Sequence, residues 1–453
     1  MAKQSTQYSC QQCGSVYPKW VGRCSGCDGW NTLVEEVIER GRGGAPSGAG
    51  GGAGGAVAMR VTDVAEDKQA RMPIGIGEFD RVLGGGLVVG GVALVGGDPG
   101  VGKSTLLLQA LASLASKGAR CLYVTAEESA GQTAARARRL GASSDNLLVL
   151  AENDLSVIES VIADVKPVAL VIDSVQTVHS PSLDSAAGTV SQLRDVAARV
   201  VDRSKRSGVA TFLVGHVTKD GMLAGPKVLE HLVDTVLAFE GERGHSFRTL
   251  RAQKNRFGSA TEVGVFEMTG EGMREVPNPS ALFLAERPCD VAGSVIAATG
   301  EGSRSMLVEV QALVGPFTAG SARRTATGVD GARLAMILAV LERKCGLALA
   351  GADVFVNIAG GARIEEPAID LPIALAIASS LRNCAIDAGV VAFGEIGLAG
   401  EVRSVPRAAS RLSEAAAMGY KRAIAPRSAE ALEVPGIEVV AVRSIDEAMA
   451  VCF

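Results

Sequence analysis

The residues Gly97–Ser104 have the types and the spacing that bind a nucleoside triphosphate. They read GDPGVGKS and fit the pattern GxxxxGK[ST], between the apolar run VALVG and the helix-like run STLLLQALASL. Glycines at these positions let backbone N–H groups turn towards phosphate oxygens, and the N-terminus of the following helix adds a positive dipole end. The alternative is an incidental Gly-rich turn between a strand and a helix, which this spacing and context disfavour.

Within this loop, Lys103 is predicted to reach the β and γ phosphates, and the Ser104 hydroxyl is predicted to ligate Mg²⁺. ATP and Mg²⁺ are therefore the expected ligands. The predicted nucleotide contacts are Gly97, Asp98, Pro99, Gly100, Val101, Gly102, Lys103, Ser104 and Thr105.

Two carboxylates follow further apolar runs. Asp173 ends the run VALVID and is predicted to hold the Mg²⁺ shell, although an aspartate after a strand is often only a cap or turn residue. Glu127 follows CLYVTA and is predicted to polarise the attacking water, because ligands bind at the carboxyl ends of parallel strands. The alternative for Glu127 is a solvated loop carboxylate.

His216, after ATFLVG, is either a sensor of the γ phosphate or a structural histidine.

Two cations, Lys254 and Arg256, stand on either side of Asn255 in the segment KNRFG. Residues two apart on a strand point the same way, so these side chains are expected to act together. One interpretation is a solvated strand edge. The other is a pair of cations that reach the triphosphate of a neighbouring subunit, where an arginine supplied in trans offsets transition-state charge.

Four cysteines near the start form two CxxC pairs, Cys10 with Cys13 and Cys24 with Cys27, separated by ten residues. Four thiolates at this spacing can close a tetrahedral Zn²⁺ site. So short a segment cannot build an adequate core, and the metal would supply the fold. A disulfide or a redox CxxC is the alternative. Such zinc knuckles bind nucleic acid or protein, and both possibilities stay open.

The elements that must position these residues follow from continuous apolar runs of strand length. Strand–helix–strand alternation without a hairpin signal predicts a parallel sheet covered on both faces. The predicted strands are 92–96, 121–126, 168–173 and 210–215, and the predicted helices between them include 104–117 and 189–207. The predicted domains are a knuckle at 1–40, a Gly-rich linker at 41–59, an ATPase domain at 60–275 and a second α/β domain at 281–453.

Composition limits the class of protein. The formal net charge of −4 excludes a basic coat protein, so any nucleic-acid contact must come from local lysines and arginines. The start of the chain does not resemble a signal peptide, and no apolar run approaches about 18 residues. We therefore expect a cytoplasmic protein without membrane contact. Five further cysteines, scattered in mostly apolar surroundings, fit a reducing compartment.

Taken together, the motifs closely resemble those of the bacterial RadA (Sms) recombination and repair ATPases over essentially the full chain. In the first part, the resemblance rests on CxxCG…WxGRCxGC with WNTLVEE, EFDRVLGGGLVVGG, GGDPGVGKSTLLLQ, YVTAEES, VIDSVQT, GHVTKDG and KNRFG. In the second part, it rests on LVEVQALV, DVFVNIAGGARIEEPAIDLPIALAIASS and FGEIGLAGEVRSV.

The resemblance implies an α/β fold with a RecA-like P-loop ATPase core, an N-terminal four-cysteine zinc knuckle and a C-terminal domain similar to Lon protease. It also implies a hexameric ring that moves on single-stranded DNA and drives branch migration of recombination intermediates with RecA. In this family and in similar ring helicases, the KNRFG cations act across the subunit interface. That role is carried here to Lys254 and Arg256.

The Lon-like region lacks the residues of an active peptidase, which needs a serine nucleophile with a lysine base. Aligning the Lon pattern on PAIDLPIAL places Asp370 and Pro372 in register and puts Ile373 where the serine would be. Ala409 falls about where the lysine would be. The domain is therefore expected to be a catalytically inactive scaffold for ring assembly, with DNA contact as a further option.

The leading hypothesis is a DNA-dependent ATPase that translocates on single strands. The loop 217–229 carries Lys219 and Lys227 among glycines and is the first choice for contacts to DNA phosphates, the alternative being an ordinary exposed loop. An ATP-fuelled peptidase is disfavoured by Ile373 and Ala409. A nucleotide-gated scaffold without motor activity is the third hypothesis, and it would turn over ATP slowly and without response to DNA.

Overall fold

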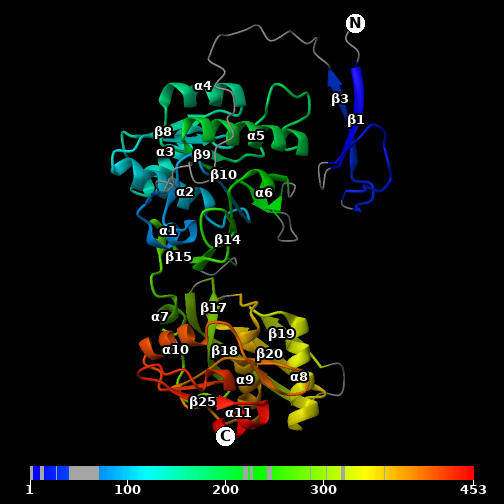
Figure 1. Cartoon of the computed structure of the whole chain (residues 1–453), viewed down its shortest axis with the longest axis vertical. Coiled ribbons are helices and arrows are strands. Elements are labelled where there is room, and N and C mark those ends of the chain that lie inside the picture. The colour runs from blue at the N-terminus through cyan, green and yellow to red at the C-terminus, as the bar shows by residue number, and fades with distance from the viewer. Residues whose placement is uncertain are drawn as a thin grey trace, which may run out of the picture. The chain divides into compact units, whose positions relative to one another are not determined.

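The computed structural model divides the chain into two compact units, Met1–Glu240 with Arg248–Glu275, and Gly241–Phe247 with Val276–Phe453. Figure 1 shows the elements of both units along the chain. The structure describes residues 4–10, 15–26, 28–39, 71–217, 223–224, 228–241, 247–285, 287–302, 304–317, 322–361 and 363–453. The predicted linker at 41–59 and the predicted start of the ATPase domain at 60 lie outside these residues.

The N-terminal module is a small antiparallel sheet in the order β2-β1-β3. Its strands are β1 (Gln4–Cys10), β2 (Val16–Tyr17) and β3 (Leu33–Glu39). Among the residues whose side chains the structure describes, the buried cluster of this module contains Cys10, Cys24 and Leu33, with Tyr8 and Tyr17 packed against it. Two of these three buried residues are cysteines predicted to bind zinc.

A nine-stranded sheet forms the centre of the first unit, in the order β16-β15-β14-β13-β6-β10-β9-β7-β8. The strands are β6 (Val92–Gly97), β7 (Cys121–Thr125), β8 (Leu147–Ala151), β9 (Ala169–Asp173), β10 (Ala210–Val214), β13 (Thr235–Glu240), β14 (Phe247–Asn255), β15 (Val263–Thr269) and β16 (Gly272–Glu275). Two short pairs accompany it, β4 (Arg71–Met72) with β5 (Leu87–Val88), and β11 (His216–Val217) with β12 (Leu223–Ala224).

Four strands of the parallel part of this sheet were correctly predicted from the apolar runs, since β6, β7, β9 and β10 lie on the four predicted strands and pair in parallel. β8 and β13 also pair in parallel within the sheet and were not among the predicted strands. Alternate residues of each strand face opposite layers. In β6, Ala93 and Val95 face α1 and α2, whereas Val92 and Leu94 face α4 and α5. The helices are α1 (Gly77–Leu83), α2 (Lys103–Ser116), α3 (Ala130–Arg139), α4 (Leu155–Val165), α5 (Val190–Ser207) and α6 (Val228–Leu232).

The strands after α6 differ from the expectation of strand–helix alternation. β13 pairs in parallel with β6, and then β14 runs antiparallel to β13. β16 runs antiparallel to β15 and ends the sheet on this side. Antiparallel neighbours can be joined by short connections, whereas parallel neighbours need a longer crossover. The sheet is therefore mixed, and its antiparallel extension positions Lys254 and Arg256.

The second unit contains a mixed seven-stranded sheet in the order β19-β20-β18-β17-β21-β24-β25. The strands are β17 (Ser294–Glu301), β18 (Arg304–Phe317), β19 (Arg324–Thr327), β20 (Ala352–Ile358), β21 (Val390–Ala392), β24 (Arg422–Pro426) and β25 (Glu438–Val442), with a small pair β22 (Glu395–Ile396) and β23 (Val402–Arg403). The helices are α7 (Pro279–Phe283), α8 (Gly331–Cys345), α9 (Asp370–Arg382), α10 (Ala408–Ala417) and α11 (Ile445–Cys452). α9 is buried along most of its length and packs on β17 and β18.

Candidate active site

The predicted phosphate loop connects β6 to α2. Gly100 and Gly102 have φ angles of 82° and 111°, in the left-handed region that favours glycine. A Cβ at Gly97 would lie 2.3 Å from the carbonyl oxygen of Phe239, and one at Gly102 would lie 2.0 Å from Cε of Met273. A Cβ at Gly100 would meet nothing within 4 Å. The loop is therefore closely packed at both ends and open in its middle, where a phosphate can approach the backbone.

The N-terminus of α2 carries no capping side chain, and its N-cap residue is Gly102. By contrast, Ser129 caps α3, Asp154 caps α4 and Asp330 caps α8. The first N–H groups of a helix need acceptors from outside the helix, and an anion is a suitable one. The start of α2 therefore has the chemistry of a phosphate cradle.

The Lys103 side chain lies inside the loop that precedes it. Its Nζ donates to the carbonyl oxygen of Gly97 at 2.6 Å and to that of Asp98 at 3.0 Å. Burial lowers the pKa of Lys103 from its ordinary value, and the carboxylates of Asp173, Asp98 and Glu127 oppose this shift. The ammonium group is thus held among the residues predicted to surround a triphosphate.

Asp173 ends β9 and accepts a hydrogen bond from the hydroxyl of Tyr123, 2.5 Å from its Oδ2. Tyr123 is buried in β7, on the side of the sheet that faces α2. Burial first, and then the Asp173 carboxylate, raise the pKa of Tyr123 well above its ordinary value, while a hydrogen bond with Ser104 acts in the opposite direction. The neutral Tyr123 hydroxyl therefore contacts both Asp173 and Ser104, the two residues predicted to hold Mg²⁺.

The two adjacent glutamates after β7 have different surroundings. Ser174, which follows Asp173 in the chain, donates a hydrogen bond to Glu127. Glu128 instead forms an ion pair with Arg136 of α3. Glu127 is exposed and lies on the Asp173 side of the sheet edge, so of the two carboxylates it is the one that can orient water beside a triphosphate.

Several residues that support this edge were missed by sequence reasoning, and Tyr123 is the most informative. A tyrosine in the otherwise apolar buried strand CLYVT was a usable signal, because a buried hydroxyl needs a hydrogen-bond partner. Gln109 of α2 bonds both backbone polar groups of Met273 in β16, and Arg248 Nε donates to the carbonyl oxygen of Val101 at 3.2 Å. These contacts to residues far along the chain carry no local signal.

Lys254 and Arg256 lie at the opposite edge of the sheet from the phosphate loop. β13 runs parallel to β6, so Thr235 at its start pairs with Ala93 near the start of β6. β14 runs back and ends with Asn255 beside Thr235. The phosphate loop follows the other end of β6. Lys254 and Arg256 therefore lie at the ends of the strands away from the phosphate loop of the same chain.

The contacts at this second edge centre on Asp234, which is buried. Arg256 forms an ion pair with Asp234 at 3.2 Å and remains half exposed, and Lys205 lies 3.8 Å from the same carboxylate. The Lys254 ammonium donates to the carbonyl oxygens of Glu230 and Val233 at 2.6 and 2.7 Å. Burial and the nearby Arg256 lower the pKa of Lys254. The two cations are thus neighbours, although Arg256 lies just after the last residue of β14.

The described half of the predicted metal site fits thiolate ligation. Cys10 and Cys24 are fully buried side by side in one cluster with Leu33. The Cys24 sulfur accepts the N–H of Gly26 at 3.4 Å and lies 3.3 Å from the Tyr17 hydroxyl. Such polar neighbours are typical of the groups that orient and stabilise metal-bound thiolates.

Four predicted site residues lie outside the part of the chain that the structure describes: Cys13, Cys27, Lys219 and Lys227. The described residues on either side of Lys219 form a short antiparallel pair, with Val217 opposite Leu223 and His216 opposite Ala224, and Lys227 follows this pair in the chain.

Comparison with known proteins identifies three regions. Residues 77–222 match the AAA domain family, residues 329–429 match the family described as subunit ChlI of Mg-chelatase, and residues 8–35 match a rubredoxin metal binding domain. The DNA repair protein RadA of Halalkalibacterium halodurans is 50% identical over 453 residues, which is 100% of this chain and 99% of that protein. The chain belongs to the RadA family.

Other proteins of the same name agree with this assignment and confirm the family predicted from the motifs. RadA of Pseudomonas aeruginosa is 50% identical, with 100% of both chains covered, and RadA of Bacillus subtilis is 47% identical, with 99% of both covered. As a RadA-family protein with an AAA domain, the chain is a DNA repair ATPase that uses ATP. Its first residues belong to a metal-binding domain.

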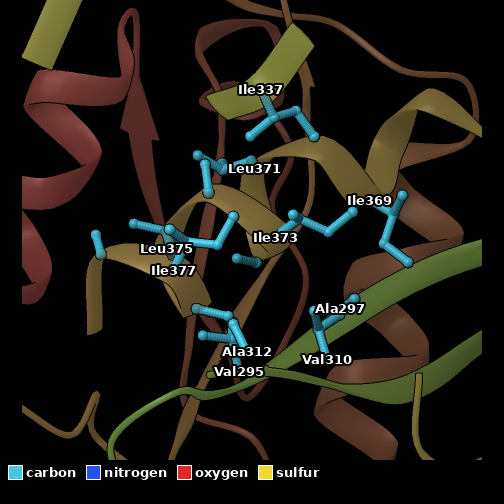
Figure 2. Close-up of a cluster of buried hydrophobic side chains, with 14 of the residues drawn as sticks. Val295, Ala297, Val310, Ala312, Ile337, Ile369, Leu371, Ile373, Leu375 and Ile377 are labelled. Atoms are coloured by element: carbon cyan, nitrogen blue, oxygen red, sulfur yellow. The ribbon is translucent and has the colours of Figure 1, made fainter. Parts of the chain in front are cut away.

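In this RadA-family chain, the ChlI-like region buries the position at which a Lon peptidase would carry its nucleophile. Ile373 is fully buried in α9, within the apolar cluster that Figure 2 shows. Ala409 is an exposed residue of α10. Ser379 donates to the carbonyl oxygen of Cys384 at 2.6 Å, and Ser380 accepts the N–H of Val314 at 3.0 Å. Both serine hydroxyls are therefore engaged in backbone contacts.

Asp370, the residue in register with the Lon pattern, is also engaged. It is buried and forms an ion pair with Arg333 at 2.7 Å. Burial raises the pKa of Asp370, and Arg333 opposes that shift.

No helix within the described residues has the length and apolar character that crossing a bilayer requires.

Proposed function

We propose that this RadA-family chain is a DNA-dependent ATPase that assembles into a homo-oligomeric ring, expected to be a hexamer, and translocates along single-stranded DNA. Its task is branch migration of recombination intermediates in recombinational repair, together with the RecA recombinase. The proposed architecture is a four-cysteine zinc knuckle, a RecA-like core and an inactive Lon-like domain. One observation carries the proposal. The phosphate loop lies at one end of the strands of the sheet, and Lys254 and Arg256 lie at the other end.

At the first edge, the loop from Gly97 to Thr105 binds the triphosphate through its backbone N–H groups, and Lys103 contacts the β and γ phosphates. Ser104 and Asp173 hold magnesium, which when bound neutralises charge on the phosphate oxygens. Glu127 orients the attacking water and accepts its proton. The proximity of Lys103, Asp173 and Glu127 supports these roles.

At the second edge, Lys254 and Arg256 act on the triphosphate of the adjacent subunit. Their distance from the phosphate loop of their own sheet supports a role in trans, because they have no route to act in cis. A guanidinium from a neighbour offsets the charge that develops as the γ phosphoryl group leaves. Each active site is then complete only when two subunits meet.

Contact with DNA is proposed for Lys219 and Lys227, on the segment that leaves the sheet after β10. β11 and β12 pair on either side of the segment that contains Lys219, and Lys227 follows β12 in the chain. Lysines in this part of the chain would neutralise DNA phosphates without reading sequence. The buried Ile373 and the exposed Ala409 support a scaffold role for the second unit and oppose a peptidase.

The test of the motor is ATP turnover by the purified full-length protein with and without single-stranded DNA. We expect DNA to raise turnover several-fold, and raised salt to remove the stimulation because phosphate contacts weaken. A nucleotide-gated scaffold predicts slow turnover that is indifferent to DNA. Equal rates under both conditions, with an assembled ring, would therefore exclude the proposed motor.

We predict that Tyr123→Phe lowers the affinity of the nucleotide site for Mg²⁺ without lowering its affinity for the nucleotide in the absence of Mg²⁺. The Tyr123 hydroxyl donates to Asp173, and a hydrogen bond to a charged group is worth about 1.5–3 kcal/mol. We expect the Mg²⁺ concentration for half-maximal binding of a fluorescent ADP to rise about tenfold. Affinity measured in EDTA is expected to stay at the wild-type value.

The matched control is Tyr420→Phe, which removes a buried tyrosine hydroxyl from the second unit, where it contacts Arg287. A general loss of stability would affect both variants, whereas a shift in Mg²⁺ dependence is expected only for Tyr123→Phe. An unchanged Mg²⁺ titration in that variant would reject Tyr123 as a positioning residue.

Zinc binding is predicted to depend on Cys24, which is fully buried in the N-terminal module. Cys24→Ala removes a thiolate ligand, and three remaining cysteines cannot complete a closed tetrahedral site. We expect zinc content measured by mass spectrometry to fall from about one ion per chain towards zero. Cys384→Ala, at an exposed cysteine of the second unit, is the control and should retain zinc. Full zinc content in Cys24→Ala would reject the four-thiolate site.

A further inference from the structure

Two tryptophans of the N-terminal module lie next to each other on its surface. Trp20 is 53% exposed and Trp30 is 69% exposed. Both reach over Gly22, since a Cβ built there would lie 3.7 Å from Cη2 of Trp20 and 3.8 Å from Cζ3 of Trp30. The glycine leaves the space between the two six-membered rings free of side-chain atoms. The two residues, called the tryptophan pair below, therefore lie together against Gly22 and present two exposed aromatic rings.

The backbone holds this surface in place. Arg23 and Trp30 form an antiparallel bridge, and the N–H of Asn31 donates to the carbonyl oxygen of Gly22 at 2.8 Å. The segments that carry the two indoles are thus joined to each other directly. A ligand that binds the tryptophan pair would not need to order the backbone first, which lowers the entropic cost of binding.

The exposure of these side chains is costly for so small a module. Among the side chains that the structure describes, Cys10, Cys24 and Leu33 form the buried cluster of the module, whereas both tryptophans are more than half exposed. Burying the two indoles would have stabilised the module through the hydrophobic effect. Large exposed apolar surface of this kind commonly marks a binding site. Val34 of the same module is also exposed but is not one of the tryptophan pair, so it offers a control position.

Basic side chains adjoin the aromatic surface. Lys19 precedes Trp20 and is exposed, with no ion-pair partner among the described residues. Arg23 forms an ion pair with Asp28 at 3.1 Å in which both side chains are mainly exposed. Exposed pairs of this kind are weak, so Arg23 can exchange Asp28 for a phosphate. Indole faces with neighbouring cations provide the chemistry that binds unpaired bases and their phosphates.

We infer that the tryptophan pair is a second binding site for single-stranded nucleic acid, on which unpaired bases stack without sequence preference while Lys19 and Arg23 contact the backbone. Stacking needs unpaired bases, so duplex DNA is not a ligand of this surface. The inference rests on the proposed function, which supplies single-stranded DNA as the ligand. The tryptophan pair would be a further binding site, remote in sequence from the ATPase core.

The experiment uses an advantage of the sequence, which contains two tryptophans in all. Selective excitation of tryptophan in the full-length protein therefore reports on the tryptophan pair alone. A short oligothymidylate is expected to quench this emission, and the same length of duplex is not. An oligonucleotide of equal charge with abasic sites offers phosphates without bases and is expected to leave the emission near its starting value.

Two variants extend the test. Trp20→Ala and Trp30→Ala should each weaken binding of the short oligothymidylate by about fivefold or more, and Val34→Ala should not. Zinc content establishes that each module is intact. Should a variant lose zinc, the quenching of the wild-type protein still decides the matter. Unchanged emission at oligonucleotide concentrations that saturate binding overturns the inference, and so does equal quenching by the abasic oligonucleotide.

These outcomes differ from those that test the motor. Turnover that rises with single-stranded DNA while the emission stays constant would reject the tryptophan site and leave the proposed function intact. Quenching with DNA-independent turnover would support the tryptophan site and reject the motor.

Discussion

Lys103→Ala is expected to abolish ATP turnover. The Lys103 ammonium lies within the phosphate loop, bonded to the carbonyl oxygens of Gly97 and Asp98, and nothing else in the loop carries a positive side chain. Removing a preorganised donor to the charge that develops in the reaction costs about a hundredfold to a thousandfold in rate. Steady-state phosphate release, measured with saturating ATP and single-stranded DNA, checks this expectation.

The control for this variant is Lys421→Ala, which removes an exposed lysine of the second unit. It should retain wild-type turnover. Thermal unfolding of Lys103→Ala in the absence of nucleotide shows whether the loop still folds, because a buried cation surrounded by Asp98 and Asp173 also balances local charge. Persistent turnover in a folded Lys103→Ala protein would refute the assignment of the phosphate loop.

Arg256→Ala is expected to leave nucleotide binding nearly unchanged and to reduce hydrolysis in the assembled ring by about a thousandfold or more. The physical reason is that Arg256 lies at the sheet edge opposite its own phosphate loop and can serve only a neighbour. Binding of a fluorescent nucleotide and single-turnover hydrolysis, measured on the same preparation, separate the two effects.

Arg256 also pairs with the buried Asp234, so loss of that pair is a competing explanation. Lys205→Ala is the matched control, because Lys205 is the other cation close to Asp234. Mixing gives a second check. Subunits with Lys103→Ala still supply Arg256, and subunits with Arg256→Ala still supply a phosphate loop, so a mixture should regain activity that neither variant has alone. Failure of the mixture to regain activity, with mixed rings present, argues against a role in trans.

The parallel core of the first unit could be predicted because its strands are buried on both faces and therefore read as continuous apolar runs. VALVG and VALVID were recognisable for this reason, and the loop pattern between strand and helix fixed the position of Lys103. The direction of β14 was not recognisable. Its sequence, FRTLRAQKN, has six polar residues out of nine, and the reversal after β13 depends on pairing with a strand already in the sheet.

The candidate site likewise contains some residues that could be recognised from the sequence and others that depend on contacts between distant segments. A strand-end aspartate and two adjacent glutamates were visible in sequence, but the choice between Glu127 and Glu128 depends on Ser174 and Arg136, which contact one each. The partner of the Tyr123 hydroxyl lies fifty residues further along the chain. Hydrogen bonds between distant segments leave no periodic pattern, so they become visible only when the strands are placed side by side.

The opposed placement of the phosphate loop and the Arg256 edge has a consequence for how copies of this chain would join. An interface that brings unlike edges together is head-to-tail, and such contacts either close on themselves or grow as open filaments. In an open row of subunits, the phosphate loop of one terminal copy has no neighbouring Arg256 beside it. Longer rows and closed rings leave a smaller fraction of phosphate loops without an arginine. The ATPase activity per subunit should therefore rise with protein concentration and then level off.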